Sequence, residues 1–331
     1  MQKSGATIAV LGAGAWGTAL AFRLAENGLQ VKLWGRDQVV ADQINTQHSS
    51  PFLPSVNLPD NLIATTDLGD SLKDISYLLI AVPSHAFDSV CEKVSEYIDL
   101  ANVAVVWATK GIDPNSNSFL SQLLNEKYHV KTLALVSGPS FAIEVGLKKP
   151  TAVNIVSEQQ QFQQGIASDF SAPSFRVYCS DDLIGSQICA IYKNVLAIAA
   201  GACDGSNMGY NARAALLTRG LEEMRRLVVA MGGQENTVYG LCGLGDLLLT
   251  ATGDLSRNRR FGLAISQYPS IAEAAKAVGK TIEGKSNIEW LLDKAKPLNI
   301  ELPICAIVDK VLHEAITIQE AIETLLERNS K

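Results

Sequence analysis

The stretch that decides the fold is Thr7-Ile-Ala-Val-Leu11, followed by the turn Gly12-Ala-Gly-Ala-Trp-Gly17 and then by Thr18–Glu26. The first segment predicts a buried strand and the last predicts a helix, so the G-x-G-x-x-G turn joins a strand to a helix. In such a turn the first glycine permits a tight bend, the second lets a pyrophosphate approach the backbone, and the third lets the helix pack closely. The N–H groups and the positive dipole end of the helix would then hold the phosphates.

The glycine turn has two other interpretations besides dinucleotide binding. A kinase glycine-rich loop has the same spacing, but none of V-A-I-K, H-R-D or D-F-G follows it in the sequence. A glycine turn that holds no ligand is the other alternative. The succession of strand, helix and second strand favours a dinucleotide over both, with Gly12, Gly14 and Gly17 as cofactor-binding residues.

The end of the second predicted strand bears on which dinucleotide binds. This strand, Gln30–Trp34, is followed by Gly35, Arg36 and Asp37, and Arg36 lies 24 residues after Gly12. An acidic residue at this point hydrogen-bonds the ribose 2′-OH of NAD, whereas an arginine accommodates the 2′-phosphate of NADP. We therefore expect NADP(H) to be preferred, with NAD(H) as the alternative. A solvated loop arginine is the non-functional interpretation of Arg36.

The first half of the chain alternates strand-like and helix-like segments. Several strands are apolar on both faces, which is typical of a parallel sheet covered by helices on both sides. The repeated units predict an α/β, Rossmann-type doubly wound domain over residues 1–182. The strands that we expect after the first two are Tyr77–Val82, Val103–Trp107, Leu133–Val136, Ala152–Val156 and Phe175–Tyr178.

Strand signals stop after about Ser180, and residues 183–331 predict an all-α domain. Its first helix, Leu183–Ala202, is strongly apolar, and Gly201–Ala212 is expected to be a loop because it is rich in Gly and Asn. The helices expected after it are Ala214–Met231, Ile271–Val278, Ser286–Ala295 and a single long helix over Ala306–Arg328.

Composition excludes several classes of protein. The 331 residues are 47% hydrophobic and 19% charged with a net charge of -6, which is typical of a soluble globular protein and argues against binding to nucleic acid or anionic membranes. No apolar run approaches the roughly 20 residues of a membrane span, and no secretory signal is evident. The six cysteines form no C-x-x-C and are expected to be buried thiols in a reducing cytoplasm. The four histidines lack paired metal spacing, so we expect no metal.

A second constellation of polar residues interrupts apolar segments further along the chain. Lys110 and the run Gly138-Pro-Ser-Phe-Ala142 both follow predicted strands, where ligands of such sheets bind. Lys193 lies in the long apolar helix, where an unpaired lysine is costly to bury. Asp246 and the cationic run Ser256–Arg260 follow it in the helical half. Each alone has a structural interpretation: a snorkelling lysine, a helix N-cap or a solvated turn.

Together these segments closely resemble the bacterial NAD(P)-dependent glycerol-3-phosphate dehydrogenases. The similar stretches span nearly the whole chain in the family's order, and they are specific only jointly. They are Gly12-Ala-Gly-Ala-Trp-Gly-Thr-Ala-Leu20, Pro51-Phe-Leu-Pro54, Val82-Pro-Ser-His85, Trp107-Ala-Thr-Lys-Gly111, Ser137-Gly-Pro-Ser-Phe-Ala142, Lys193-Asn-Val195, Asn211-Ala-Arg-Ala-Ala-Leu216, Thr218-Arg-Gly-Leu221, Gly243-Leu-Gly-Asp246 and Ser256-Arg-Asn-Arg-Arg-Phe-Gly262.

The resemblance implies roles for individual residues. Lys193 would be the catalytic residue, and Lys110 and Arg257 would each contact both substrate and cofactor. The other substrate-binding residues would be Gly138, Ser140, Asp246, Ser256 and Asn258. The other cofactor-binding residues, besides the glycines, would be Ala15, Trp16, Arg36, Ala142 and Glu283. Ala15 and Trp16 replace a Ser-Tyr type pair found in some members, and Arg36 stands where others carry His.

The reaction that the resemblance implies is reduction of dihydroxyacetone phosphate to sn-glycerol 3-phosphate, which supplies glycerophospholipid synthesis. The nicotinamide would provide the hydride and Lys193 the proton, while the Arg257 guanidinium would match the phosphate oxygens. A homodimer in the cytoplasm is also implied. The alternatives are a β-hydroxyacid or ketopantoate-type reductase with the same architecture, and a dinucleotide sensor without catalysis.

Overall fold

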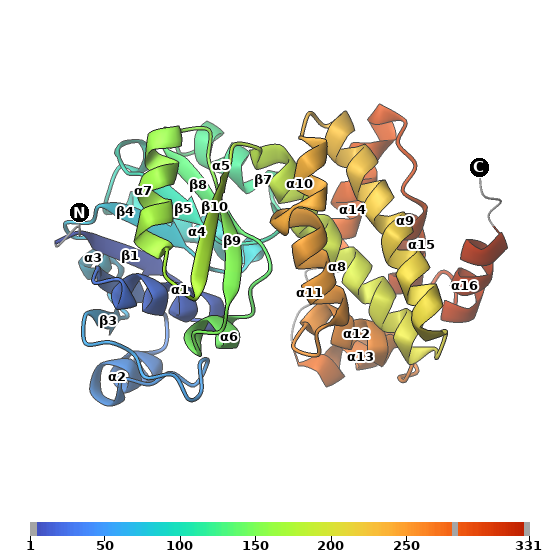
Figure 1. Cartoon of the computed structure of the whole chain (residues 1–331), viewed down its shortest axis with the longest axis horizontal. Coiled ribbons are helices and arrows are strands. Elements are labelled where there is room, and N and C mark those ends of the chain that lie inside the picture. The colour runs from blue at the N-terminus through green and yellow to red at the C-terminus, as the bar shows by residue number, and fades with distance from the viewer. Residues whose placement is uncertain (1–4, 280–283, 328–331) are drawn as a thin grey trace. The chain divides into compact units, whose positions relative to one another are not determined.

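The computed structural model describes residues 5–279 and 284–327 of the chain, coloured along the sequence in Figure 1. The chain divides into two compact units, Met1–Leu183 and Ile184–Lys331. The first contains strands and helices, and the second contains helices.

The described part of the first unit forms an eight-stranded sheet in the order β10-β9-β8-β5-β4-β1-β2-β3. The run β3-β2-β1-β4-β5-β8 is the doubly wound dinucleotide-binding order, and its pairs are all parallel. The predicted α/β class is therefore confirmed. The strands are β1 Thr7–Leu11, β2 Gln30–Trp34, β3 Leu62–Thr65, β4 Tyr77–Ile80, β5 Val105–Trp107, β8 Leu133–Ser137, β9 Thr151–Val156 and β10 Phe175–Ser180.

The sheet differs from the predicted one in two respects. Strand β9 is antiparallel to β8, so the sheet is mixed at this side. Strand β3 was not predicted, because it is a short edge strand whose exposed Ile63 breaks the pattern of a strand buried on both faces. A small hairpin of β6 Ile112–Asp113 and β7 Ser118–Phe119 lies outside this sheet.

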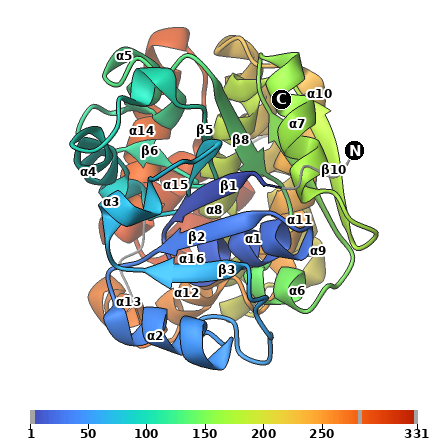
Figure 2. The same ribbon diagram turned by 90° about the vertical axis from the view of Figure 1, so that its left-hand side faces the viewer.

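Helices cover both faces of the sheet. Phe22 of α1, Val145 of α6 and Phe170 of α7 share one buried cluster with Ile8 and Val10 of β1. Figure 2 shows α4 and α5 on the side of the sheet opposite α1 and α6. The helical segments are α1 Ala15–Glu26, α2 Gln38–Gln47, α3 Leu68–Ser71, α4 Ser84–Ser95, η1 Leu100–Asn102, α5 Leu120–Glu126, α6 Ala142–Gly146 and α7 Gln160–Phe170.

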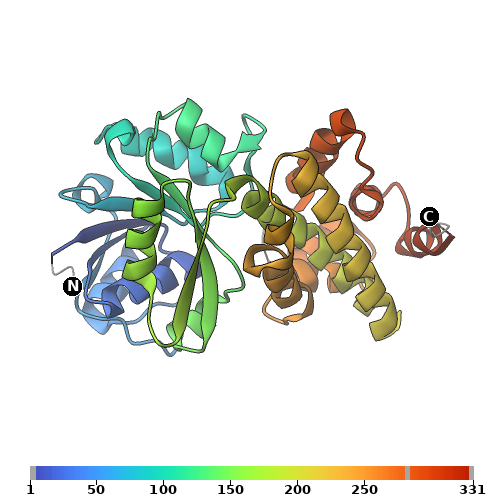
Figure 3. The same cartoon turned by 45° about the horizontal axis from the view of Figure 1, so that its top comes forward.

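The second unit has no strand in its described residues, which confirms the predicted all-α half (Figure 3). Its central helix, α8, is the longest and most deeply buried. The elements are α8 Leu183–Gly205, α9 Gly209–Ala230, α10 Glu235–Tyr239, the π-helical η2 Leu241–Gly245, α11 Asp246–Thr252, α12 Arg257–Ile265, α13 Ile271–Val278, α14 Gly284–Ala295, η3 Lys296–Leu298, α15 Pro303–Leu312 and α16 Ile318–Glu327.

The predicted loop Gly201–Ala212 is wrong, since α8 continues to Gly205 and α9 begins at Gly209. Gly201 and Gly262 instead lie where two helices pack closely. A Cβ at Gly201 would overlap the carbonyl oxygen of Arg259, and a Cβ at Gly262 would overlap that of Ile198. Glycine here allows α8 and α12 to touch backbone to backbone.

The predicted single helix Ala306–Arg328 is also wrong, because two helices occupy this region. The first, α15, ends at Leu312, and Glu314 takes a left-handed conformation with φ of 55°. A capping box then restarts the helix: Glu320 accepts from the Thr317 N–H at 2.7 Å, and Thr317 Oγ1 accepts from the Glu320 N–H at 3.2 Å.

Helix α8 also corrects the expectation that no apolar run approaches a membrane span. It has 23 residues and a mean hydropathy of 1.5 over its most apolar window. By length and composition alone, such a helix could cross a membrane. However, 89% of that window is buried inside the protein, as in the core helix of a globular domain. A further correction concerns Cys179, which is exposed on β10 rather than buried.

A buried carboxylate fastens α9 to its neighbours. Glu223 accepts from Tyr192 Oη at 2.7 Å and from the Ile304 N–H at 2.9 Å, at the start of α15. Burial raises the pKa of Glu223, and these hydrogen bonds oppose that rise. The side chain thereby links α8, α9 and the N-terminus of α15.

We predict that Gly262→Ala destabilises the second unit by about 1–3 kcal/mol, because the new methyl group must push α8 and α12 apart. Urea unfolding measures the change. Gly240→Ala is the matched control, since the nearest atoms to its Cβ lie at 3.5 Å. Equal stability of the two variants would contradict the close helix contact.

Candidate active site

The glycine turn after β1 has the geometry that a dinucleotide requires. Gly12 has a φ of 119°, and a Cβ there would lie 2.6 Å from the Ala81 oxygen at the end of β4. A Cβ at Gly17 would overlap the Gly12 carbonyl, so α1 can approach only with glycine at that position. By contrast, open space surrounds the position of a Gly14 Cβ, and in the described residues no side chain caps α1 at this glycine. The turn therefore leaves room and N–H donors for a pyrophosphate.

Three of the remaining cofactor candidates lie on two helices. Ala15 is exposed at the start of α1, and Trp16 is half-buried against the core beside it. Ala142 begins α6, which packs on the same core. Glu283 lies outside the described residues.

The end of β2 is held beside the glycine turn. A Cβ at Gly35 would lie 2.6 Å from that of Ala13, so the two turns touch. Asp37 caps α2 by accepting from the Val39 N–H at 2.9 Å, which commits its carboxylate to the helix. Arg36 is exposed at this point. An exposed guanidinium beside a committed carboxylate suits a 2′-phosphate better than a free ribose hydroxyl.

Three predicted substrate residues meet at the carboxyl ends of β5 and β8. The Lys110 ammonium donates to the Gly138 carbonyl at 3.4 Å, and Ser140 Oγ donates to the same oxygen at 3.1 Å. Gly138 has a φ of 124°, a backbone conformation that favours glycine. In an α/β sheet of this order, ligands bind at this edge.

The second unit holds the other polar group, centred on Lys193 of α8. Its ammonium donates to Asp246 Oδ1 at 2.7 Å and to Thr250 Oγ1 at 3.0 Å. The side chains of Lys193 and Asp246 are only 6% and 2% exposed. Asp246 is the first residue of α11 and Gly245 its N-cap, so the N-cap interpretation of Asp246 is wrong.

Sequence reasoning missed Thr250. It lies four residues after Asp246, which places both side chains on one face of α11. The spacing could have predicted Thr250 as a site residue, since a polar pair on one face of an otherwise apolar helix needs a buried partner. Lys193 is that partner.

The cationic run forms the start of α12. Ser256 is buried and caps the helix, accepting from the Arg259 N–H at 3.2 Å. Arg257 is exposed and Asn258 half-buried in the first turn. Arg259 is paired with Asp254 at 2.7 Å and Asp204 at 2.8 Å. Arg257, which directly follows the N-cap Ser256, therefore has the exposed guanidinium closest to the start of the helix.

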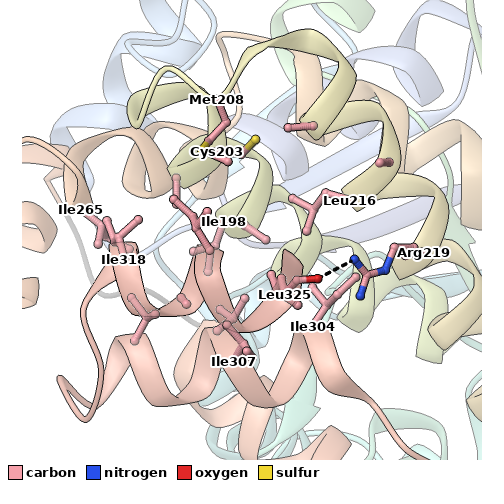
Figure 4. A pocket seen from close by; sticks show the side chains of 18 of the residues that line it. Ile198, Cys203, Met208, Leu216, Arg219, Ile265, Ile304, Ile307, Ile318 and Leu325 are labelled. Carbon is pink, nitrogen blue, oxygen red and sulfur yellow. Dashed lines mark hydrogen bonds between the residues drawn. The ribbon is translucent and has the colours of Figure 1, made fainter. Parts of the chain in front are cut away.

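An apolar cavity of about 160 Å³ lies elsewhere in the second unit, walled by α8, α9, α15 and α16 (Figure 4). None of the predicted site residues that the structure describes lines it. Among the described lining residues, Arg219 carries the one charge, and it donates to the Leu325 carbonyl at 3.2 Å. An almost wholly apolar wall offers no group for acid–base chemistry, so this cavity is not the catalytic site. Among the residues that the structure describes, no cluster of three His, Cys, Asp or Glu side chains could hold a metal ion.

The fold and these two polar groups define a two-domain nicotinamide-dependent oxidoreductase. Models of the N-terminal and C-terminal parts of NAD-dependent glycerol-3-phosphate dehydrogenase match residues 7–163 and 182–323. The chain belongs to the glycerol-3-phosphate dehydrogenase [NAD(P)+] family, which confirms the resemblance.

Three relatives illustrate the match. The chain is 44% identical over 98% of its length to a Xanthomonas campestris protein named glycerol-3-phosphate dehydrogenase [NAD(P)+], covering 95% of it. It is 43% identical to the protein of that name from Stenotrophomonas maltophilia, over 100% of this chain and 97% of that one. A crystal structure of glycerol-3-phosphate dehydrogenase from Coxiella burnetii has 42% identity and a TM-score of 0.91, covering 98% of this chain and 99% of that one.

We predict that the buried Lys193–Asp246 pair is kept for chemistry and not for stability. Lys193→Met or Asp246→Leu alone removes the partner at 2.7 Å from a buried charge and should destabilise the protein by about 3–5 kcal/mol. The double variant should recover most of that loss and remain without activity. Denaturant unfolding of all four proteins measures this, and two additive losses would contradict it.

Proposed function

We propose that the protein reduces dihydroxyacetone phosphate to sn-glycerol 3-phosphate with NADPH. The observation that carries the proposal is the buried Lys193 ammonium, held by Asp246 and Thr250 in a chain of this family. Residues 1–182 would form the dinucleotide-binding domain and residues 183–331 the substrate domain.

Each polar group has a task in the proposed reaction. When bound, the nicotinamide supplies the hydride. Asp246 and Thr250 hold the Lys193 side chain in one orientation, and Lys193 is the proton donor that ketone reduction needs. In the reverse direction the neutral amine accepts the alcohol proton.

The substrate phosphate is a handle remote from the reacting carbon. Arg257 would bind it as a fork, with Ser256 and Asn258 in the same turn of α12. Lys110, Gly138 and Ser140 would contact the substrate from the sheet edge, with Lys110 and Arg257 also reaching the cofactor. Binding energy from the phosphate orients the ketone for attack.

The alternatives from the sequence differ in substrate or in catalysis. A β-hydroxyacid or ketopantoate-type reductase would bind a carboxylate in place of a phosphate, and the match to glycerol-3-phosphate dehydrogenases over both halves of the chain favours the phosphorylated ketone. A dinucleotide sensor would not need a buried ammonium tied to a carboxylate. A homodimer, a cytoplasmic location, the absence of a metal and a supply role in glycerophospholipid synthesis stay predictions.

The reaction is tested by mixing the purified protein with dihydroxyacetone phosphate and NADPH and following the loss of reduced-nicotinamide absorbance. We expect rapid oxidation that requires the phosphorylated ketone. Lys193→Ala should lower kcat by at least about 100-fold, the contribution of a general acid. Near-normal turnover of that variant, or no oxidation by a wild-type protein that binds NADPH, would contradict the proposal.

Arg36 is predicted to select NADPH. Arg36→Ala removes a charge-assisted contact to the 2′-phosphate, which should raise the KM for NADPH about 10- to 100-fold. The KM for NADH should change little, since NADH has no phosphate there. Parallel titrations with both cofactors measure this. An equal rise for both would instead indicate a general defect of the β2 end.

A further inference from the structure

Asp204 lies near the end of α8, and its carboxylate is shared by two arginines. Its Oδ2 accepts from Arg213 Nη1 at 2.7 Å and from Arg259 Nη2 at 2.8 Å. The Asp204 and Arg259 side chains are only 13% and 12% exposed, so this pair is well shielded from water. The Arg213 guanidinium also lies 5.1 Å from the centre of the Tyr210 ring. These contacts tie the end of α8 to the start of α9 and to α12.

Arg259 is anchored through its main chain as well as its side chain. Its N–H donates to Ser256 Oγ at 3.2 Å, and its Nη1 pairs with Asp254 Oδ1 at 2.7 Å. Arg259 directly follows Arg257 and Asn258 in the chain, and it is thus held through both its main chain and its side chain. Its guanidinium is committed to carboxylates, whereas that of Arg257 is exposed.

The helices α8 and α12 are in backbone contact beside the Asp204–Arg259 pair, which restricts how far they can shift against each other. Gly201 and Gly262 leave no space between the helices for a side chain. Helix α8 also carries Lys193. The Asp204–Arg259 pair therefore fixes the first turn of α12 on the same helix that carries the proposed proton donor.

We infer that Asp204 and Arg259 are positioning residues that orient Arg257 and Asn258 for the substrate phosphate. This inference rests on the proposed function. Without the carboxylate, the two arginines repel each other and the turn loses its alignment with Lys193. A shift of about 1 Å at a binding group is enough to cost a large factor in substrate use.

The first test is Asp204→Asn, which keeps the shape of the side chain and removes its charge. The KM for dihydroxyacetone phosphate should rise at least about tenfold, while kcat changes less than about threefold. Reduction of dihydroxyacetone, which lacks the phosphate, should stay within about twofold of the wild type. Glu222→Gln is the control, because it breaks another carboxylate–arginine pair of the second unit, with Arg225 at 2.7 Å within α9. It should leave both substrates unaffected.

A double-mutant cycle shows whether the pair acts through Arg257. In an Arg257→Met background, Asp204→Asn should add less than about a twofold rise in KM, because the group that it positions is gone. Arg259→Lys, which retains one charge towards Asp204, should give a KM between those of the wild type and Arg259→Met. Additive effects on KM in the cycle, or equal losses of activity with both ketones, would contradict the positioning role and leave the pair with a structural role alone.

The two proposals can fail separately. If the wild type does not reduce dihydroxyacetone phosphate, the proposed function fails before any variant is compared. The positioning role is then decided by calorimetric binding of inorganic phosphate to the wild type and Asp204→Asn. Binding weakened at least about tenfold in the variant supports the positioning role, and equal binding or none in the wild type overturns it.

Discussion

The interaction on which the rest of the site depends is the buried ion pair of Lys193 and Asp246. Burying an ammonium and a carboxylate costs several kcal/mol each, and their attraction often does no more than offset that cost. Here the pair is nearly inaccessible to water, with a 2.7 Å contact and Thr250 as a further acceptor for the ammonium. A chain under selection for stability alone could fill this space with apolar side chains. Retaining the pair is consistent with a proton donor that must be held in one orientation.

The second unit is built outward from the helix that carries this lysine. Asp246 fastens α11 to α8, Gly201 and Gly262 bring α12 into backbone contact with it, and Asp204 pairs with Arg259. Glu223 links α8 and α9 to α15 on another side. In the first unit, the glycine turn and the end of β2 form a separate set of contacts suited to a dinucleotide. Each unit thus supplies a different part of the proposed chemistry.

Much of this could be predicted from the sequence, for identifiable reasons. The strands β1, β4, β5 and β8 were predicted from apolar runs, because strands buried on both faces leave a strong signal. The strands β2, β9 and β10 were predicted as well, although part of each is exposed or half-buried. The edge strand β3 was missed because a half-buried strand of four residues is too short for its pattern to stand out. The loop predicted from Gly201 was wrong, since a glycine that allows close helix packing looks in sequence like one that ends a helix.

The contacts of the site could not be predicted from the sequence. Lys193 and Asp246 are 53 residues apart, and only the folded chain shows their contact. The identities of the residues came from the resemblance, whereas the partners Thr250 and Asp204 required the structure.

The central claim is that Lys193 gives the proton to the ketone oxygen. A crystal structure with NADP+ and dihydroxyacetone phosphate, a pair that cannot react, tests it most directly. We predict that Lys193 Nζ lies about 2.6–3.2 Å from the ketone oxygen while keeping its contact with Asp246. An ordered ketone whose oxygen is bound by another group, with no contact from Lys193, would contradict the claim.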